Sequence, residues 1–195
     1  RAHEAGIVHR DLKPDNVFLS EVEGDPLHVK IVDFGISKIQ KGDNKTLPLA
    51  LTGRGIVLGT PFYMSPEQAQ ALDDVDARTD LWAVGAILFE SLTGRPPHVG
   101  EHYEQVILSI CMKDAPDVRA IEPAVPEPVS RFVARSLERD RAQRFASARM
   151  MLAALHEIAP EERTRAPLDP PALQTERSPG LHESAPPDTP RPSAS

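Results

Sequence analysis

The sequence lacks several features on which whole classes of protein depend. Its 195 residues include a single cysteine, Cys111, so the chain can form neither an internal disulfide framework nor a cysteine-rich zinc site. The formal net charge of -7 argues against nucleic acid or an anionic membrane surface as the default partner, because both attract basic patches. The longest strongly apolar run, residues 81–89, falls far short of the roughly 20 residues that a membrane span needs. We therefore predict no membrane span in this chain.

The last part of the chain lacks aromatic residues and is rich in proline. Of the 20 prolines, nine lie in the 36 residues 160–195, which include no Phe, Trp or Tyr. Such a composition buries too little apolar surface to offset the entropy that is lost when a chain becomes ordered. We therefore predict a folded domain at residues 1–158 and a Pro-rich disordered linker or tail at residues 159–195.

Hydrophobic patterns predict a mostly helical body that carries one β-hairpin. Two β-branched runs, 17–19 and 29–32, flank a Glu-Gly-Asp-Pro turn, which indicates a hairpin. Residues 33–67 show neither the helical nor the strand period of apolar residues. A connection of that length without helices or strands of its own is usually functional or mobile. Four helices are expected from the apolar spacing and from the Gly and Pro residues that end them, at 79–92, 103–112, 129–137 and 148–158.

The first and last of these helices have different apolar patterns. The helix at 79–92 is apolar all round and ends at Gly94, as expected for a buried central helix with Trp82 in the core. In the helix at 148–158, four apolar residues follow spacings of three and four, and we expect them to form one face that docks on the core. These residues are Met151, Leu152, Leu155 and Ile158.

Two polar strings carry the residue types that perform chemistry. The first, His-Arg-Asp-Leu-Lys-Pro-Asp-Asn, spans residues 9–16 and is called the polar loop below; the second, Asp-Phe-Gly, begins at Asp33. Asp11 and Asn16 stand at the two ends of a tight turn, and the hairpin that follows would return Asp33 beside them. The site would also contain the ammonium group of Lys13. Carboxylate and amide oxygens suit Mg²⁺, which keeps several waters and bridges phosphates.

These strings resemble the catalytic loop and the metal-binding loop of protein kinases. Two further strings match in order and at similar spacing: residues 59–67 resemble the end of the activation segment, with Ser65 where Ala is more usual, and residues 80–85 resemble the start of the central helix. The resemblance covers about residues 1–158. It implies an α+β, protein-kinase-like fold: a mainly helical carboxyl-terminal lobe with a small β-hairpin and an activation segment, followed by the disordered tail.

The resemblance implies roles for several polar residues of these strings. Asp11 would accept or orient the proton of a substrate hydroxyl, and Lys13 would neutralise charge on the γ-phosphoryl group of ATP. Asn16 and Asp33 would hold Mg²⁺ against the nucleotide phosphates, so the expected cofactors are ATP and Mg²⁺. Thr60 would hydrogen-bond near Asp11 and place the acceptor hydroxyl. A lysine two residues after Asp11, together with Thr60, is typical of kinases directed to Ser and Thr.

The resemblance also implies structural and regulatory residues. Glu67 and Arg144 fall where an ion pair stabilises the end of the activation segment, and Asp80 is expected to brace the backbone of the polar loop as well as to start a helix. Arg10 would bind a phosphorylated residue of the activation segment, because guanidinium pairs well with phosphate. The two candidate phosphorylation sites, of which the second is favoured, are Thr46 and Thr52.

The activity implied by the resemblance is ATP-dependent phosphoryl transfer to Ser or Thr hydroxyls of protein substrates, as in a signalling kinase. Protein kinases bind ATP between two lobes, and the amino-terminal lobe supplies a Gly-rich loop and a Lys–Glu pair. Neither is found in this sequence, which begins with Arg1 in what resembles the last turns of a helix. We therefore expect a partial kinase domain that needs the missing amino-terminal lobe as its partner and is inactive alone.

Two other interpretations stay open from the sequence. A non-catalytic regulatory or scaffold fragment would bind partners through the helical lobe, although the presence of Asp11, Lys13, Asn16 and Asp33 favours an enzyme. A phosphotransferase for small molecules is disfavoured by the complete activation segment. Residues 92–97, Leu-Thr-Gly-Arg-Pro-Pro, resemble bacterial Ser/Thr kinases, in many of which a Pro-rich linker leads to a membrane span, so membrane attachment would belong to a longer parent. The need for ATP and the lack of an export signal predict a cytoplasmic location.

Overall fold

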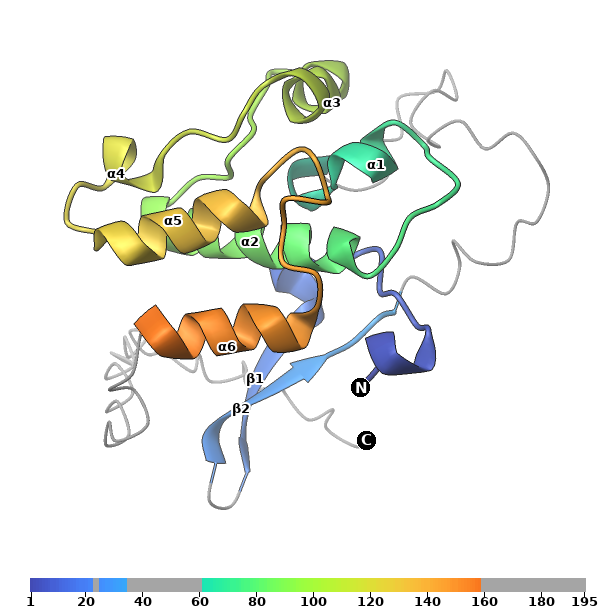
Figure 1. Ribbon diagram of the computed structural model, residues 1–195, viewed down its shortest axis with the longest axis vertical. Helices are drawn as coiled ribbons and strands as arrows, with labels where there is room; N and C mark the ends of the chain where they lie inside the picture. Colours follow the sequence, from blue (N-terminus) through green and yellow to red (C-terminus); the bar gives the residue numbers. More distant parts are fainter. Residues whose placement is uncertain (23–24, 35–60, 159–195) are drawn as a thin grey trace, which may run out of the picture. The chain divides into compact units, whose positions relative to one another are not determined.

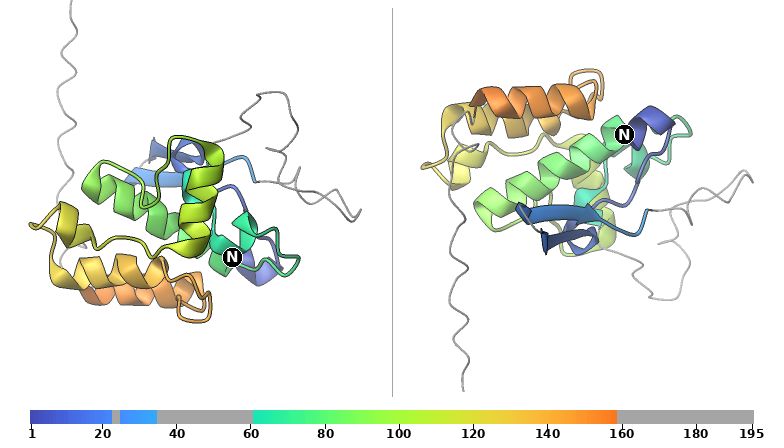
Figure 2. Two further views of the ribbon diagram at one scale, coloured as in Figure 1. Left: turned by 90° about the horizontal axis from the view of Figure 1, so that it is seen from above. Right: turned by 90° about the horizontal axis from the view of Figure 1, so that it is seen from below.

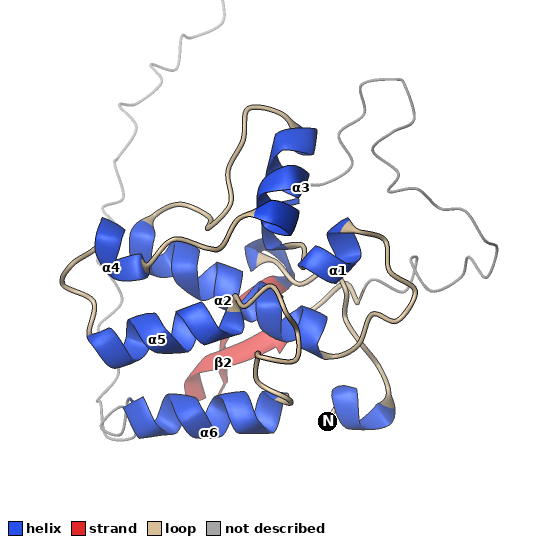
Figure 3. Cartoon of the chain, turned by 45° about the horizontal axis from the view of Figure 1, so that its top comes forward, coloured by secondary structure: helices blue, strands red, loops and turns tan. Residues whose placement is uncertain are grey.

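Helices dominate the computed structural model, which describes residues 1–22, 25–34 and 61–158. Within these ranges a two-stranded sheet lies among the helices, with its strands drawn in red in Figure 3, so the predicted α+β class is confirmed. The helices are α1 (Pro66–Ala69), α2 (Arg78–Thr93), α3 (Tyr103–Met112), α4 (Val118–Ile121), α5 (Glu127–Ser136) and α6 (Ala148–Ile158), as labelled in Figure 1. Short 3₁₀ turns lie at His3–Ala5, Pro14–Asn16 and Pro61–Tyr63. None of the helices in the described ranges is long and apolar enough to cross a membrane.

The predicted hairpin is present and starts directly after the polar loop. Strands β1 (Val17–Val22) and β2 (Asp25–Ile31) pair antiparallel, with Val17 opposite Ile31. The pairing register shifts between residues 20 and 22, as at a β-bulge. Because the two ends of a hairpin lie side by side, the residues before β1 and after β2 are brought to one place.

The helix predictions differ from the structure mainly at short elements. Helices α3 and α6 have the predicted bounds, while α2 and α5 begin one and two residues earlier than predicted. The interpretation of residues 33–67 as a connection without elements is wrong at its end, where a 3₁₀ turn and the start of α1 lie. Neither α1 nor α4 is predicted, since four residues make about one turn and show no period. The predicted tail, 159–195, lies outside the described residues.

Helix α2 is the centre of the described lobe. In both views of Figure 2, α2 lies between the hairpin on one side and α5 and α6 on the other. The helix ends at Gly94, whose φ of 74° is left-handed and whose N–H bonds the carbonyl of Glu90. Gly85 allows α5 to approach closely, because a Cβ at this position would lie 2.6 Å from the Cβ of Ser136. The packing of α2 on α5 therefore depends on a residue without a side chain.

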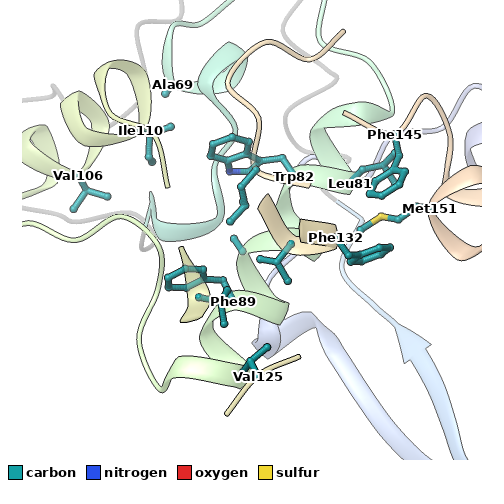
Figure 4. Close-up of a cluster of buried hydrophobic side chains, with 14 residues drawn as sticks. Ala69, Leu81, Trp82, Phe89, Val106, Ile110, Val125, Phe132, Phe145 and Met151 are labelled. Carbon is teal, nitrogen blue, oxygen red and sulfur yellow. The ribbon is translucent and has the colours of Figure 1, made fainter. Parts of the chain in front are cut away.

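The core surrounds the single tryptophan, as predicted. Trp82 and Phe89 on α2 and Ile110 on α3 are fully buried, and Figure 4 shows how their side chains lie within the cluster. On the opposite side of the cluster, the rings of Phe132 and Phe145 lie 5.0 Å apart. Full burial of a large apolar side chain stabilises a fold by about 1.5 to 3 kcal/mol, so this cluster holds the helices together.

The predicted apolar face of α6 is correct only in part. Met151 is buried and Ile158 packs against the core, but Leu152 and Leu155 are 52% and 37% exposed. Successive residues of an α-helix are separated by about 100°, so Leu152 is turned well away from the line through Met151 and Ile158. Ala154 takes the inward position instead.

A buried histidine completes the core beside Trp82. His98 is 2% exposed, its ring stacks on that of Trp82 with the centroids 6.0 Å apart, and its Nδ1 lies 3.1 Å from the hydroxyl of Ser109. The other ring nitrogen, Nε2, has no hydrogen-bond partner among the described residues. Burial lowers the pKa of His98 to about 4, against a smaller opposing effect of Asp114 and with a small contribution from Lys113.

We expect His98 to make stability depend on pH. Since its pKa is lower in the folded than in the unfolded state, the unfolded state binds more protons between pH 6.5 and 4, and stability is lost as the pH falls. The free energy of unfolding should decrease by about 2 kcal/mol between pH 7 and pH 5 from this group alone. Urea unfolding across this range should show a smaller decrease for His98→Phe. An equal decrease for the exposed control His156→Asn and for His98→Phe would contradict the assignment.

Candidate active site

The polar loop is held through its main chain by side chains from other elements. Asp80, in the first turn of α2, accepts hydrogen bonds from the N–H of His9 at 2.8 Å and from that of Arg10 at 2.9 Å. Asn16 donates from Nδ2 to the carbonyl of Asp11 at 2.8 Å. Arg10 has a φ of 64°, a left-handed conformation that costs a non-glycine residue about 1 to 3 kcal/mol. The surrounding contacts therefore hold the loop in a strained shape.

His3 makes a second contact with Asp80 that the sequence does not predict. Its Nε2 lies 2.8 Å from Oδ2 of Asp80, and Gly6, with a left-handed φ of 73°, ends the 3₁₀ turn that carries His3. A glycine after the last residue of a helical turn is a local sequence signal for its end. The contact itself joins residues 77 positions apart and has no local sequence signal.

Asp11 and Lys13 line a pocket. Lys13 Nζ lies 3.5 Å from Oδ2 of Asp11, and the two side chains are 30% and 39% exposed, respectively. The pocket lies between the polar loop and the segment of residues 61–68, called the facing segment below, and Tyr63, Met64 and Gln68 line it from that segment. A carboxylate in such a position can accept the proton of a hydroxyl that enters the pocket, and the ammonium group adds a positive charge beside it.

Tyr63 is fixed on the facing segment by a hydrogen bond to α2. Its hydroxyl donates to Oε2 of Glu90 at 2.6 Å. Burial, the hydrogen bond and the charge of Glu90 all raise the pKa of Tyr63, so the phenol stays protonated and keeps donating. This contact attaches the facing segment to the central helix.

The hairpin returns Asp33 to the neighbourhood of Asn16. The N–H of Val32 donates to the main-chain carbonyl of Asn16 at 3.0 Å, and Val32's own carbonyl lies 3.0 Å from Nε2 of His9. The ring of Phe34 lies 4.7 Å from that of His9. Asp33 therefore follows directly on a residue that is bonded to both ends of the polar loop.

The donor set at this place fits Mg²⁺. Asn16 uses its Nδ2 for the carbonyl of Asp11, so its amide oxygen is the atom that could face a cation, and Asp33 offers an exposed carboxylate. Within the described ranges, no group of three His, Cys, Asp or Glu residues could hold a metal ion. Mg²⁺ does not require such a cage, because it is usually bound by one or two protein oxygens together with waters and substrate phosphates.

Glu67 and Arg144 form a buried bidentate ion pair. Arg144 donates from Nη1 and Nη2 to the two carboxylate oxygens of Glu67 at 2.8 and 2.9 Å, and both residues are almost fully buried. The hydroxyl of Thr79 donates to the same carboxylate at 2.7 Å and lies 2.7 Å from that of Ser65. Burial alone would raise the pKa of Glu67, but the hydrogen bonds and charge of Arg144 outweigh it and lower the pKa. The guanidinium also lies 4.9 Å from the centre of the Trp82 ring.

Gln68 is a contact residue of the polar loop that the sequence interpretation missed. With Ser65 it forms a capping box at the start of α1, and its Nε2 donates to the main-chain carbonyl of Arg10 at 2.7 Å. The Ser-x-x-Gln spacing is a signal for the cap. The bond to Arg10 spans 58 positions, so only the folded chain reveals it.

The structure thus brings together Asp11, Lys13 and Asn16 directly and Asp33 through the hairpin. The predicted partners of Arg10, which are Thr46 and Thr52, lie outside the described residues, and so does Thr60. The roles given to these three threonines stay predictions.

A polar loop braced by the central helix, beside a hairpin that returns an aspartate to it, is the arrangement that the protein kinase resemblance implies. The family model described as protein kinase domain matches residues 2–156. The chain therefore belongs to the protein kinase family.

Several curated relatives of the chain are bacterial serine/threonine-protein kinases. The chain is 39% identical over 146 residues to serine/threonine-protein kinase Pkn1 of Myxococcus xanthus, a match that covers 75% of this chain and 20% of Pkn1. It is 43% identical over 131 residues to the DNA damage-responsive serine/threonine-protein kinase RqkA of Deinococcus radiodurans, a match that covers 67% of this chain and 18% of RqkA. It is 36% identical over 160 residues to serine/threonine-protein kinase PknL of Mycobacterium tuberculosis, a match that covers 82% of this chain and 37% of PknL. The chain thus spans well under half the length of these relatives.

Proposed function

We propose that this chain supplies the substrate-facing part of a serine/threonine protein kinase, which transfers the γ-phosphoryl group of ATP to Ser or Thr hydroxyls of proteins. The observation that carries the proposal is the placement of Asp11. Asp11 lines a pocket beside the facing segment, its carboxylate lies 3.5 Å from the ammonium of Lys13, and its carbonyl is fixed by Asn16. Positioning and electrostatics supply most of the catalysis of phosphoryl transfer, and these contacts provide both.

Each residue of the site has a part in the proposed reaction. Asp11 accepts or orients the proton of the substrate hydroxyl, so that the oxygen can attack the phosphoryl group. Lys13 stabilises the negative charge of that group through its ammonium. Asn16 and Asp33 hold Mg²⁺, which when bound neutralises charge on the nucleotide phosphates. Thr60 helps to place the acceptor hydroxyl beside Asp11.

We also propose that the reaction requires an amino-terminal lobe that binds the nucleotide. The hairpin supports this proposal, because Leu19, Val29 and Ile31 share one face of it and are 68%, 54% and 47% exposed, and exposed apolar residues that lie together mark an interaction site. The chain by itself should then have little or no activity. Phosphorylation of Thr46 or Thr52, with Arg10 as the partner of the phosphate, would regulate the enzyme, and we propose that it acts in the cytoplasm.

The experiment is a transfer assay with radiolabelled ATP and a generic Ser/Thr protein. It uses both the 195-residue chain and the longest polypeptide encoded in frame with it. We expect Mg²⁺-dependent labelling of Ser or Thr by the longer polypeptide, and phosphoamino-acid analysis identifies the acceptor. Removal of Mg²⁺ by a chelator should abolish labelling, and excess Mg²⁺ should restore it, because Asn16 and Asp33 bind the nucleotide phosphates only through the ion. Labelling that persists in the chelator, or that occurs on Tyr alone, would contradict the proposal.

A further inference from the structure

The peptide groups on both sides of Arg10 are held by side chains from distant parts of the chain. The N–H of Arg10 donates to Asp80 on α2, and its carbonyl accepts from Gln68 on α1, at 2.9 and 2.7 Å. Asp11 follows directly, and Asn16 holds its carbonyl at 2.8 Å. The left-handed φ of Arg10, 64°, turns the chain at this point, so the direction of the Asp11 side chain depends on how Arg10 is held.

Gln68 divides its amide group between two tasks. Its Nε2 donates to the carbonyl of Arg10, while its Oε1 accepts from the N–H of Ser65 at 3.2 Å, and the hydroxyl of Ser65 in turn accepts from the N–H of Gln68 at 3.4 Å. Ser65 is fully buried, so the oxygen end of the amide is anchored. The nitrogen end then reaches from the facing segment to the residue that precedes Asp11.

We propose that Gln68 is a positioning residue that couples the facing segment to Asp11 through the main chain of Arg10. The proposal rests on the proposed function. Gln68 acts from the same segment as Tyr63 and Met64, which line the pocket opposite Asp11. A shift of this segment is transmitted by the amide to the strained residue, and from there to the carboxylate. The substrate side of the pocket and the group that receives the hydroxyl proton thereby keep their relative positions.

Two substitutions separate this role from helix capping. Gln68→Glu keeps an oxygen that can accept from Ser65 and so keeps the capping box, but it replaces the donor by an oxygen that faces the carbonyl of Arg10. Gln68→Leu removes both interactions. If Gln68 only caps α1, the Glu variant should behave like the unsubstituted protein. Gln70→Glu controls for the added negative charge, because Gln70 is exposed and caps the carboxyl end of α1, two residues after Gln68.

The first measurement uses the longer, active polypeptide. We expect both Gln68 variants to lower kcat by about 10- to 100-fold, the range typical of a small misplacement of a reacting group. The KM for ATP should change by less than about twofold, since Gln68 touches no residue assigned to the nucleotide. Gln70→Glu should leave both constants unchanged. Retention of the full kcat by Gln68→Glu would overturn the proposal.

The second measurement does not depend on activity and uses the 195-residue chain. Amide hydrogen exchange measured by NMR should be at least about tenfold faster at Arg10 and Asp11 in Gln68→Glu, while exchange within α2 stays unchanged. Unchanged exchange at Arg10 would refute the coupling even if the protein is an active kinase. Faster exchange in a protein that transfers no phosphate would instead support the coupling and refute the proposed function.

Discussion

Replacement of Asp11 by Asn is expected to lower the rate of phosphoryl transfer by about 10²- to 10⁴-fold, the usual loss when a general base is removed. The amide has the same shape as the carboxylate but cannot accept a proton. The loop should keep its structure, because the hydrogen bonds at 2.8 and 3.3 Å that fix Asp11 use its main-chain carbonyl and N–H. The ion pair with Lys13 is partly exposed, so its loss should reduce the free energy of unfolding by less than about 1 kcal/mol.

The matched control for this variant is Asp15→Asn. Asp15 lies in the same loop, is exposed, and undergoes the same chemical change. Initial rates of transfer to a Ser/Thr protein should be unaffected by this change, and both variants should unfold only slightly more easily than the unsubstituted protein, if at all. Equal transfer rates for Asp11→Asn and the unsubstituted protein would refute the role of Asp11.

The largest loss of stability is expected from Arg144→Met. Removal of the guanidinium leaves the carboxylate of Glu67 buried and unpaired, which typically costs about 3 to 5 kcal/mol. Thr79 still donates one hydrogen bond to this carboxylate, but the positive charge of the Arg144 guanidinium, which balances the carboxylate in the ion pair, is lost. The free energy of unfolding, measured with urea at pH 7, should fall by this amount.

Two further variants test whether the unpaired charge is the cause. Arg141→Met removes an arginine whose partner, Asp74, is mostly exposed, and should lower the free energy of unfolding far less, because exposed ion pairs contribute little to stability. The double variant Glu67→Leu/Arg144→Met should lose less than Arg144→Met alone, because no buried charge is left. An equal decrease in the free energy of unfolding for Arg141→Met and Arg144→Met would show that the buried ion pair contributes no more to stability than an exposed one.

The pair also predicts the direction of the acid dependence. The pKa of Glu67 is lower in the folded state than its ordinary value of 4.5, so its contribution to stability is complete above that value and is lost as the pH falls through the lowered pKa. In Arg144→Met, protonation of Glu67 removes the unpaired charge. The difference between the two proteins should therefore shrink in acid.

Local patterns in the sequence predict much of the fold and the members of the site. The turn between Asp11 and Asn16 and the hairpin behind it are adjacent in the chain, so their geometry follows from local signals. The side chains that hold the loop are different, because Asp80 and Gln68 meet Arg10 across 70 and 58 positions. Motif resemblance predicts the role of Asp80, whereas no pattern indicates the bond of Gln68. The exposed Leu152 shows the same limit, since spacing alone does not reveal which side of a helix meets the core.

The long separation between the polar loop and its supports has a consequence for the order of folding. A ribosome synthesises Arg10 and Asp11 before the residues that hold them, and the main-chain contacts of Arg10 close loops of 58 and 70 positions. Closing such loops costs chain entropy that is recovered only when α1 and α2 have formed and packed. Asp11 is therefore synthesised before Gln68 and Asp80, and it reaches its final position only after these residues have packed against Arg10.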